Sequence, residues 1–446
     1  MRKYGFLQLI LSITLTAPSA AQQKAPQISL DQAIAIALEG NISVIQAENT
    51  LEAQESGRLA AYGDLLPSLS ASGGWTRSQS STGTLFVQGI PIPGGTTTRN
   101  SFSTGLNAQV TLFNGFANTA NLNRAGASVH AAEHSLHRTR QQTAYETTQF
   151  YLNVLRTKEL LKVRQENLKR SKKQLERIQE GSRVGSLSLA DVYRQQVQVG
   201  NDELSMIQAQ NDFDKSKADL AFYLALNVME EYDFIDPTIS LDIDTADFRA
   251  LNERYKNVPV LVQEALRVRP DYQSALASYN SASSGVSVAW ASHLPSVSAF
   301  ASYGYNSVEL ATLSDNRSST WGLQISFPIF SGFRVDNQVQ QARVNERIAF
   351  EQLKQAERKV QLDIKKTLLD LEAAEKQIDV TKKSVVSADQ DRRIAEEKYN
   401  LGAGTLLDLL VASANYVSAV SNKVNAVYNY NLVKKQLEFA AGTLQY

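Results

Sequence analysis

One pentapeptide has the residue types and the spacing of a catalytic metal site. His130 to His134 (HAAEH) matches the H-x-x-E-H pattern of a class of zinc proteases, in which two imidazoles one helical turn apart hold the metal. The corresponding pentapeptide 217 residues later runs from Arg347 to Glu351 and contains no histidine. We therefore interpret 130–134 as a satisfied or solvated histidine cluster, with a zinc metalloprotease as a remote alternative.

The composition gives little further support for catalysis. The chain has no cysteine, which excludes disulfides, thiolate zinc sites and cysteine nucleophiles. The acidic stretch around Asp242 and Asp244 lacks the glycine that a calcium-binding loop has at its sixth position. The 45 basic and 45 acidic residues balance, so no net field favours a nucleic acid partner. We expect no enzymatic activity, no metal and no cofactor.

Two turns with the same residue pattern carry other polar residues of interest. The turn 183–191 matches the turn 400–408: a glycine ends one helix, a Ser or Thr caps the next, and an aspartate lies in its first turn. The matched residues are Gly185 and Gly402, Ser188 and Thr405, and Asp191 and Asp408. An aspartate there also complements the positive end of the helix dipole, which is a purely structural explanation.

These matched turns belong to an internal duplication. Residues 66–71 recur as 294–299, an offset of 228, and residues 112–116 recur as 329–333, an offset of 217. The second match marks two junctions between strand and helix, at Phe113, Asn114 and Gly115 and at Phe330, Ser331 and Gly332. The first half is 11 residues longer, and this surplus falls in 78–100, where Ser, Thr, Gly and Pro predict a longer loop.

Each half also contains two segments in which polar and apolar residues alternate. They predict strands at about 68–78, 101–112, 296–306 and 319–329. Strands of about 10 residues with one apolar face are typical of a membrane β-barrel, and a soluble sheet with one wet face is the alternative. In a barrel, the lipid-facing side chains would be Leu106, Val110, Trp321, Leu323, Ile325 and Phe327.

Four strands are too few to close a barrel. Open sheet edges cannot lie in hydrocarbon, so several chains would have to share one barrel. Two copies would give eight strands and a filled interior, whereas three would give twelve strands and a lumen. The strand pattern by itself favours neither number.

Long helices account for most of the rest of the chain. No proline lies between Gly94 and Asp236 or after Pro328, which leaves room for two helices of about 100 Å, to about Ser182 and about Asn400. Asn114 and Ser331 are the predicted N-caps of these helices. From Val360 to Ala388, apolar and small residues recur in steps of four and three, which predicts supercoiled packing.

The chain divides into four segments. Residues 1–21 combine a basic start, an apolar stretch too short for a bilayer and a small-residue cleavage site, which predicts an export signal. We then expect a first repeat at 22–226, an acidic connector around the middle of the molecule at 227–257, and a second repeat at 258–446. An exported coiled-coil structural or adaptor protein is an alternative function, although it does not explain the strands.

The duplicated order of helix, strand pair and long helix pair, the junctions and the tip turns resemble the TolC family of outer-membrane efflux and secretion channels. The resemblance covers essentially the whole mature chain. It implies a mixed α+β membrane protein, with a homotrimeric twelve-stranded transmembrane β-barrel in the outer membrane. A helical coiled-coil barrel continues this barrel into the periplasm.

The function that the resemblance implies is a passive exit duct. The duct would serve a tripartite efflux pump or a type I secretion system. The implied partners are a periplasmic adaptor, an inner-membrane transporter of the RND or ABC type and outer-membrane lipid. The substrate is not indicated, because a shared tunnel carries whatever its transporter delivers.

The resemblance also implies a gate at the periplasmic tip. Tyr399 corresponds to a latching tyrosine, Asp191 to its acceptor on the other helix pair, and Asp408 to a lining aspartate. Gly404 stands where the family has a latching arginine, and Val411 where it has a second lining aspartate. The predicted gate also includes the turn glycines Gly185, Gly402 and Gly404.

Overall fold

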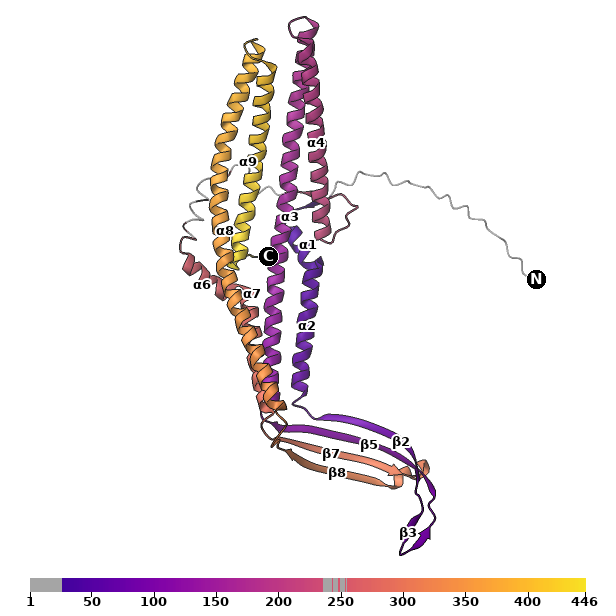
Figure 1. The fold of residues 1–446 in the computed structure, drawn as a ribbon. Helices are drawn as coiled ribbons and strands as arrows, with labels where there is room; N and C mark the ends of the chain where they lie inside the picture. Colours follow the sequence, from indigo (N-terminus) through magenta and orange to yellow (C-terminus); the bar gives the residue numbers. More distant parts are fainter. Residues whose placement is uncertain (1–25, 236–242, 244–247, 249–252, 254) are drawn as a thin grey trace, which may run out of the picture.

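The computed structural model describes residues 26–235, 243, 248, 253 and 255–446. Long helices extend from one end of a small sheet, which gives an elongated molecule (Figure 1). The predicted export signal at 1–21 lies outside the described residues, and so do Asp242 and Asp244 in the predicted acidic connector.

The helices of the two halves match in order and in length. The first half has α1 (Leu30–Gly40), α2 (Ile42–Gly63), α3 (Ala117–Arg183) and α4 (Leu189–Tyr223), of 11, 22, 67 and 35 residues. The second half has α6 (Val258–Val268), α7 (Pro270–Ala291), α8 (Arg334–Asn400) and α9 (Leu406–Ala441), of 11, 22, 67 and 36 residues. The duplication predicted from the sequence is therefore present in the fold.

One antiparallel sheet contains a strand pair from each half. Its order is β2 (Ser68–Ser81), β5 (Thr96–Asn114), β7 (Ser296–Ser307) and β8 (Arg317–Ser326). Two smaller pairs lie elsewhere, β1 (Gln27–Ile28) with β6 (Asp233–Phe234), and β3 (Leu85–Val87) with β4 (Ile90–Ile92). Within the described residues, β2 and β8 are the free edges of the four-stranded sheet.

The strand bounds correct the sequence prediction in two places. The stretch 78–100 is not only a loop, because β2 continues to Ser81, β5 already begins at Thr96, and β3 and β4 form a hairpin between them. At the other end, β8 stops at Ser326 rather than 329. Its partner β7 begins at Ser296, which pairs with Ser326, and Pro328 has no N–H to donate to a ladder.

The predicted helical stripe is the packed face of α8. Val360, Ile364 and Leu371 are all buried, and they form one cluster with apolar residues of α6 and α9. A second cluster joins α1, α3 and α4 to Val424 and Tyr428 of α9, so the two halves share a core near the middle of the molecule. Among the described residues, no helix is both long and apolar enough to cross a membrane.

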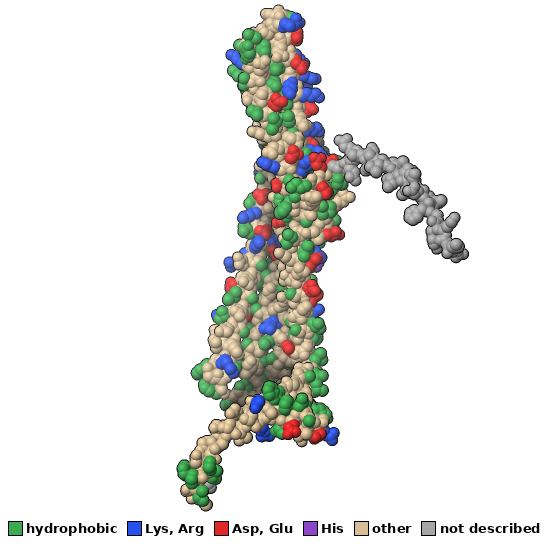
Figure 2. All heavy atoms as spheres, turned by 90° about the vertical axis from the view of Figure 1, so that its right-hand side faces the viewer, with side chains coloured by type: hydrophobic (Ala, Val, Ile, Leu, Met, Phe, Trp, Pro, Cys, Tyr) green, Lys and Arg blue, Asp and Glu red, His purple; other side chains and the backbone are tan. Residues whose placement is uncertain are grey.

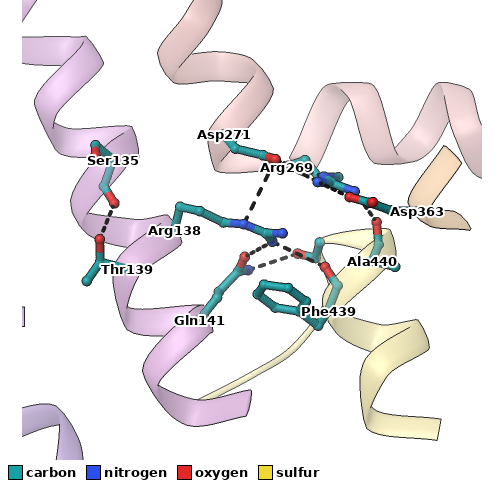
Figure 3. A network of polar contacts seen from close by, with 10 residues as sticks. Ser135, Arg138, Thr139, Gln141, Arg269, Asp271, Asp363, Phe439 and Ala440 are labelled. Carbon is teal, nitrogen blue, oxygen red and sulfur yellow. Dashed lines mark hydrogen bonds and ion pairs between the residues drawn. The ribbon is translucent and has the colours of Figure 1, made fainter. Parts of the chain in front are cut away.

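A buried arginine fastens the second half together where α6 meets α7 (Figure 3). Arg269 is fully buried, and its Nη2 donates to Asp271 at 2.6 Å and to Asp363 at 3.0 Å. Its Nη1 donates to the carbonyl of Ala440 near the end of α9, at 3.0 Å. Burial alone would lower the pKa of Arg269, but the hydrogen bonds to Asp271 and Asp363 and the negative charges of these carboxylates raise it overall. The arginine therefore remains charged and links three helices.

Arg138 of α3 connects this cluster to the first half. Its Nε lies 4.0 Å from Asp271, and its guanidinium stacks 3.7 Å above the ring of Phe439. Burial and the neighbouring charge of Arg269 outweigh the nearby carboxylates and lower the pKa of Arg138 to about 10. We refer to Arg138, Arg269, Asp271 and Asp363 as the arginine cluster.

The first half has a weaker version of the same arrangement. Asn41 replaces Arg269 at the offset of 228, and its Nδ2 donates to the carbonyl of Tyr223 at 3.4 Å. Tyr223 in turn corresponds to Ala440 at the offset of 217. In both halves, a side chain at this junction donates a hydrogen bond to a carbonyl at the end of the last helix. In the second half the donor is the buried, charged Arg269, and in the first half it is the neutral Asn41.

Candidate functional site

The four-stranded sheet has one face on which the predicted lipid-facing residues meet. Cross-strand partners lie on the same face, and the register pairs Leu106 with Tyr303, Val110 with Ala299, Ala299 with Leu323, Ala301 with Trp321 and Val297 with Ile325. Trp321, Leu323 and Ile325 are 83%, 68% and 71% exposed in the single chain. Exposure of this face to lipid remains a prediction.

The opposite face of the sheet is polar over most of its length. Asn107 pairs with Ser302 and donates from Nδ2 to the hydroxyl of Ser72 at 3.5 Å, and Gln324 pairs with Ser298. Phe327, which the sequence assigned to the lipid-facing set, follows the end of β8 and is 59% exposed. A β-bulge between Thr111 and Phe113 interrupts the alternation near the end of β5.

The two junctions between sheet and helix have the same unusual backbone. Gly115 and Phe116 have φ of 66° and 67°, and Gly332 and Phe333 have φ of 63° and 62°. Two successive left-handed residues turn the chain sharply, and a phenylalanine in this conformation is strained.

Aromatic rings accompany both turns. Phe113 meets Phe116 edge to face with a centroid distance of 5.3 Å, and Phe330 meets Phe333 in the same way at 5.7 Å. Edge-to-face packing is a favourable geometry for such rings and holds each turn in place. The matched geometry shows that the FNGF and FSGF motifs are one structural unit used twice.

The long helices begin later than predicted. Their N-caps are Phe116 and Phe333, and neither makes a side-chain cap. Asn114 Oδ1 instead accepts from the backbone N–H of Asn118 at 3.3 Å, and Ser331 Oγ accepts from that of Val335 at 3.5 Å. The predicted capping residues thus satisfy helix donors from two positions before the cap, because the left-handed pair folds them back over the first turn.

The tip turns close as predicted. Ser188 and Thr405 are the N-caps of α4 and α9, and they accept from the backbone N–H of Asp191 and Asp408. Thr405 also donates from its hydroxyl to the carboxylate of Asp408 at 2.7 Å. The side-chain and backbone hydrogen bonds from Thr405 lower the pKa of Asp408.

The glycines of the two tips have different tasks. Gly185 and Gly402 have φ of 76° and 70°, a conformation that favours glycine. Gly404 lies close to the end of α8, where a Cβ would lie 3.0 Å from the Cβ of Lys398 and the lysine would have to shift by a few tenths of an ångström. In the other tip the small residue is Gly181, whose missing Cβ makes room for Leu187. At the offset of 217, Lys398 corresponds to Gly181 and Gly404 corresponds to Leu187. The small residue of the pair therefore precedes the turn in the first tip and follows it in the second.

Tyr399 lies where the two helix pairs meet below the tip. It is 8% exposed and packs with Ile178 and Val192 of the first pair and Leu406 and Leu409 of the second. Burial, together with the negative charge of Asp191, raises the pKa of its phenol. Its hydroxyl has no hydrogen-bond partner among the described residues, and the Asp191 carboxylate instead accepts from Ser188 and Arg194. The predicted latch is therefore not formed within one chain.

Charged residues that the sequence did not single out join the helix pairs beside Tyr399. Arg177 of α3 lies 3.4 Å from Glu396 of α8, and Arg392 of α8 donates to Glu396 at 3.0 Å. The guanidinium groups of Arg170 and Arg392 lie 5.5 Å and 5.2 Å from the ring of Tyr416 on α9. The one sequence signal for the contact between Arg177 and Glu396 is their separation of 219 residues. This is close to the repeat offset of 217, so the two residues lie at nearly equivalent positions of α3 and α8.

A groove of about 540 Å³ runs between the helix pairs at this level. Its charged lining is mainly basic, with five cations and two carboxylates, namely Arg164, Arg170, Lys173, Arg177, Arg392, Asp202 and Glu396. Gln195 and Gln198 contribute amides, and Leu410 and Val417 supply an apolar floor. The groove combines the apolar surface and the polar rim that a helical partner requires.

The histidine pentapeptide does not form a metal centre in this arrangement. His130 Nδ1 lies 2.9 Å from a carboxylate oxygen of Glu133, and the His130 side chain is 63% exposed. The pKa of His134 is lowered, mainly by burial. Across the described residues there is no group of three or more potential ligands placed to hold a metal ion.

Comparison with known proteins places this architecture among outer-membrane channels. A family described as "Outer membrane efflux protein" matches residues 33–226 and 261–443. The Outer membrane protein TolC of Escherichia coli is 25% identical over 376 residues, which cover 76% of this chain and 74% of that protein.

Two solved structures share the fold. The outer membrane protein VceC of Vibrio cholerae superposes with a TM-score of 0.78 at 21% identity, over 93% of this chain and 96% of that one. The open-state MtrE outer membrane channel of Neisseria gonorrhoeae superposes with a TM-score of 0.75 at 19% identity, over 93% and 88%. At these identities the likeness concerns the arrangement of the elements.

Proposed function

The chain belongs to the outer membrane efflux protein family, and on that premise we propose that three copies form a passive exit duct from the periplasm to the exterior. The observation that carries the proposal is the four-stranded sheet, which has an apolar face and two free edges and continues directly into helices of 67 residues. At 1.5 Å per residue, such helices extend about 100 Å from the membrane.

The free edges of β2 and β8 support the sharing of one barrel. An unpaired edge in lipid leaves a row of backbone N–H and C=O groups without partners, each at a cost of several kcal/mol. Pairing β8 of one copy with β2 of the next satisfies both edges. Three copies give a twelve-stranded barrel wide enough for a lumen, as a duct requires.

The gate of the duct is the tip, where Tyr399, Asp191 and Asp408 lie with the glycines Gly185, Gly402 and Gly404. In a symmetric trimer three copies of Asp408 surround one axis, and their like charges attract cations and repel anions. The buried hydroxyl of Tyr399 lacks a partner among the residues that the structure describes, and such a group costs about 1–3 kcal/mol. A small movement of the helix pairs that brings it onto Asp191 would remove this cost and latch the closed state.

The basic groove between the helix pairs is the docking surface of the periplasmic adaptor. An amphipathic helix of the adaptor would lay apolar residues on Leu410 and Val417 and present acidic residues to Arg170 and Arg177. Through the adaptor, the duct connects to an inner-membrane transporter of the RND or ABC type. The transporter supplies both the energy and the choice of substrate.

Single-channel recording in planar bilayers tests the duct and its gate. We expect a cation-selective trimeric channel whose conductance rises in Tyr399→Phe and whose cation selectivity weakens in Asp408→Ala. Asp214→Ala, at an exposed position in the second half of α4 and away from the tip, is the matched control and should leave both properties unchanged. Recording at low salt makes the charge effect largest. Absence of channel activity would refute the duct, and wild-type behaviour of both tip variants would refute the gate alone.

A further inference from the structure

The hairpin formed by β3 and β4 exposes a set of apolar side chains at the far end of the molecule. Leu85, Phe86, Ile90 and Ile92 are 62%, 72%, 67% and 49% exposed. No Asp, Glu, Lys or Arg occurs from Ser78 to Thr98. Figure 2 shows hydrophobic side chains gathered at this end, beyond a sheet surface that is mostly polar or backbone. An uncharged apolar hairpin in water favours burial against a partner.

Membrane lipid is too far from the hairpin to be that partner. Phe102 of β5 is the last residue paired with β7, and it stacks with Trp75 at a centroid distance of 6.4 Å, in the position of an interfacial aromatic pair. Beyond it, Thr96–Ser101 pair with β2 alone. Six residues at about 3.4 Å each, tilted by about 45°, raise the hairpin roughly 14 Å above this level.

The hairpin forms its own ladder beyond the strands that carry it. Its ladder is a separate two-stranded sheet, joined to the end of the β2–β5 ladder by hydrogen bonds from the N–H and the hydroxyl of Thr82 to the carbonyl of Gly95, at 3.0 and 3.2 Å. Gly83, Gly94 and Gly95 lie in the connection. In Figure 1 the hairpin bends away from the plane of the sheet near the ends of β2 and β5.

The matching apolar surface lies on the loop between β7 and β8. In this loop, Val308 and Leu310 are 47% and 66% exposed, and the short helix η1 (Leu310–Asp315) leads into β8. The hairpin grows from β2, which is one edge of the sheet, and the loop leads into β8, which is the other edge. In a barrel shared between copies, β2 and β8 of neighbouring copies are adjacent. The hairpin then lies beside the loop of the neighbouring copy, as well as beside the loop of its own copy, where β5 pairs with β7.

We propose that the β3–β4 hairpin of each copy packs against the β7–β8 loop of the adjacent copy and fastens the seam at the outer mouth of the barrel. The occupant of the apolar hairpin is therefore a second copy of this chain. This inference rests on the shared barrel of the proposed function. It adds an intersubunit contact outside the membrane, made by the 11-residue surplus that distinguishes the first half from the second.

Disulfide crosslinking in intact outer membranes tests the contact, because the natural chain has no cysteine that could interfere. In the double variant Phe86→Cys/Leu310→Cys, mild oxidation should shift most of the chain on a non-reducing gel from monomer to linked dimers and trimers. Each single variant is the control and should remain monomeric. Crosslinking of Phe86→Cys alone would overturn the inference, since the hairpins would then meet one another on the axis.

Two further measurements keep the outcomes distinct. In Phe86→Trp, brominated lipid should not quench the added fluorescence, and quenching would overturn the inference in favour of lipid. The mass of the wild-type assembly in detergent reports the trimer independently. A trimeric mass without the Phe86–Leu310 crosslink overturns the hairpin contact and leaves the duct intact, whereas a monomeric mass overturns both.

Discussion

Replacement of Arg269 by methionine should destabilise the fold by about 3 kcal/mol. The Arg269 side chain is 0% exposed, whereas its partners Asp271 and Asp363 are 25% and 31% exposed. Loss of one member of a buried ion pair costs about 3–5 kcal/mol, chiefly because the remaining charge is left uncompensated. Both carboxylates can be partly rehydrated here, which places the expected loss at the lower end of that range. Methionine keeps most of the packing volume, so a cavity contributes little.

The assay is denaturant unfolding of protein refolded into lipid vesicles, with the free energy of unfolding taken from the midpoint and the slope. Arg267→Met is the matched control, because Arg267 is exposed in the last turn of α6, two residues before Arg269, and should change stability by less than about 0.5 kcal/mol. Asp363→Asn in both backgrounds completes a double-mutant cycle. Additive losses in the cycle, or equal effects at 267 and 269, would refute the reasoning.

Three other predictions follow from the sheet, from the junction glycines and from Asp271. Leu323→Arg should cost about 2–4 kcal/mol in vesicles and Gln324→Arg much less, and equal losses would mean that the faces of the sheet are assigned the wrong way round. Gly115→Ala should destabilise more than Gly332→Ala, by about 1–3 kcal/mol, because both have positive φ but only at Gly115 would a Cβ meet neighbours, at 2.7 Å. Burial would raise the pKa of Asp271, but the hydrogen bond from Arg269 and the charge of Arg138 lower it overall. The resulting stability is complete above pH about 4 and is lost as the pH falls through the lowered pKa, so acid titration of the unfolding midpoint should show a loss that Asp271→Asn abolishes.

The long helices could be predicted because their signal is local and repeated. The absence of proline sets their possible length, and the four-three spacing from Val360 to Ala388 identifies the packed face before any partner is known. None of the predicted stripe positions in this stretch is exposed in the structure. The two faces of the sheet likewise follow from alternation, since Leu323 and Ile325 lie on the face that contains Leu106.

The missed features depend on conformations or partners that a residue pattern does not specify. The start of β5 at Thr96 consists of polar residues without alternation, and its strand geometry comes from pairing with β2 up to Ser81. Phe116 is not a capping residue by type, so its left-handed conformation could not be expected. Arg269 binds Asp363 and Ala440, 94 and 171 residues away. Aligning the repeats at 228 would have shown a charged residue in place of Asn41 at a buried junction.

The tip shows why the duplication matters for the proposed gate. Equivalent positions in the two tips keep the glycine with positive φ, the cap and the aspartate, since these define the turn itself. The tips differ in which residue of a contacting pair is glycine. In the first tip Gly181 contacts Leu187, and in the second tip Gly404 contacts Lys398. An arginine in place of Gly404 would bring a Cβ to 3.0 Å from the Cβ of Lys398, so Lys398 would have to shift by a few tenths of an ångström. In the proposed gate, closure by the second helix pair would rely on Tyr399 and on the contact between Arg177 and Glu396. Tyr399→Phe in a chain that also carries Arg177→Gln should therefore open the duct further than either change alone.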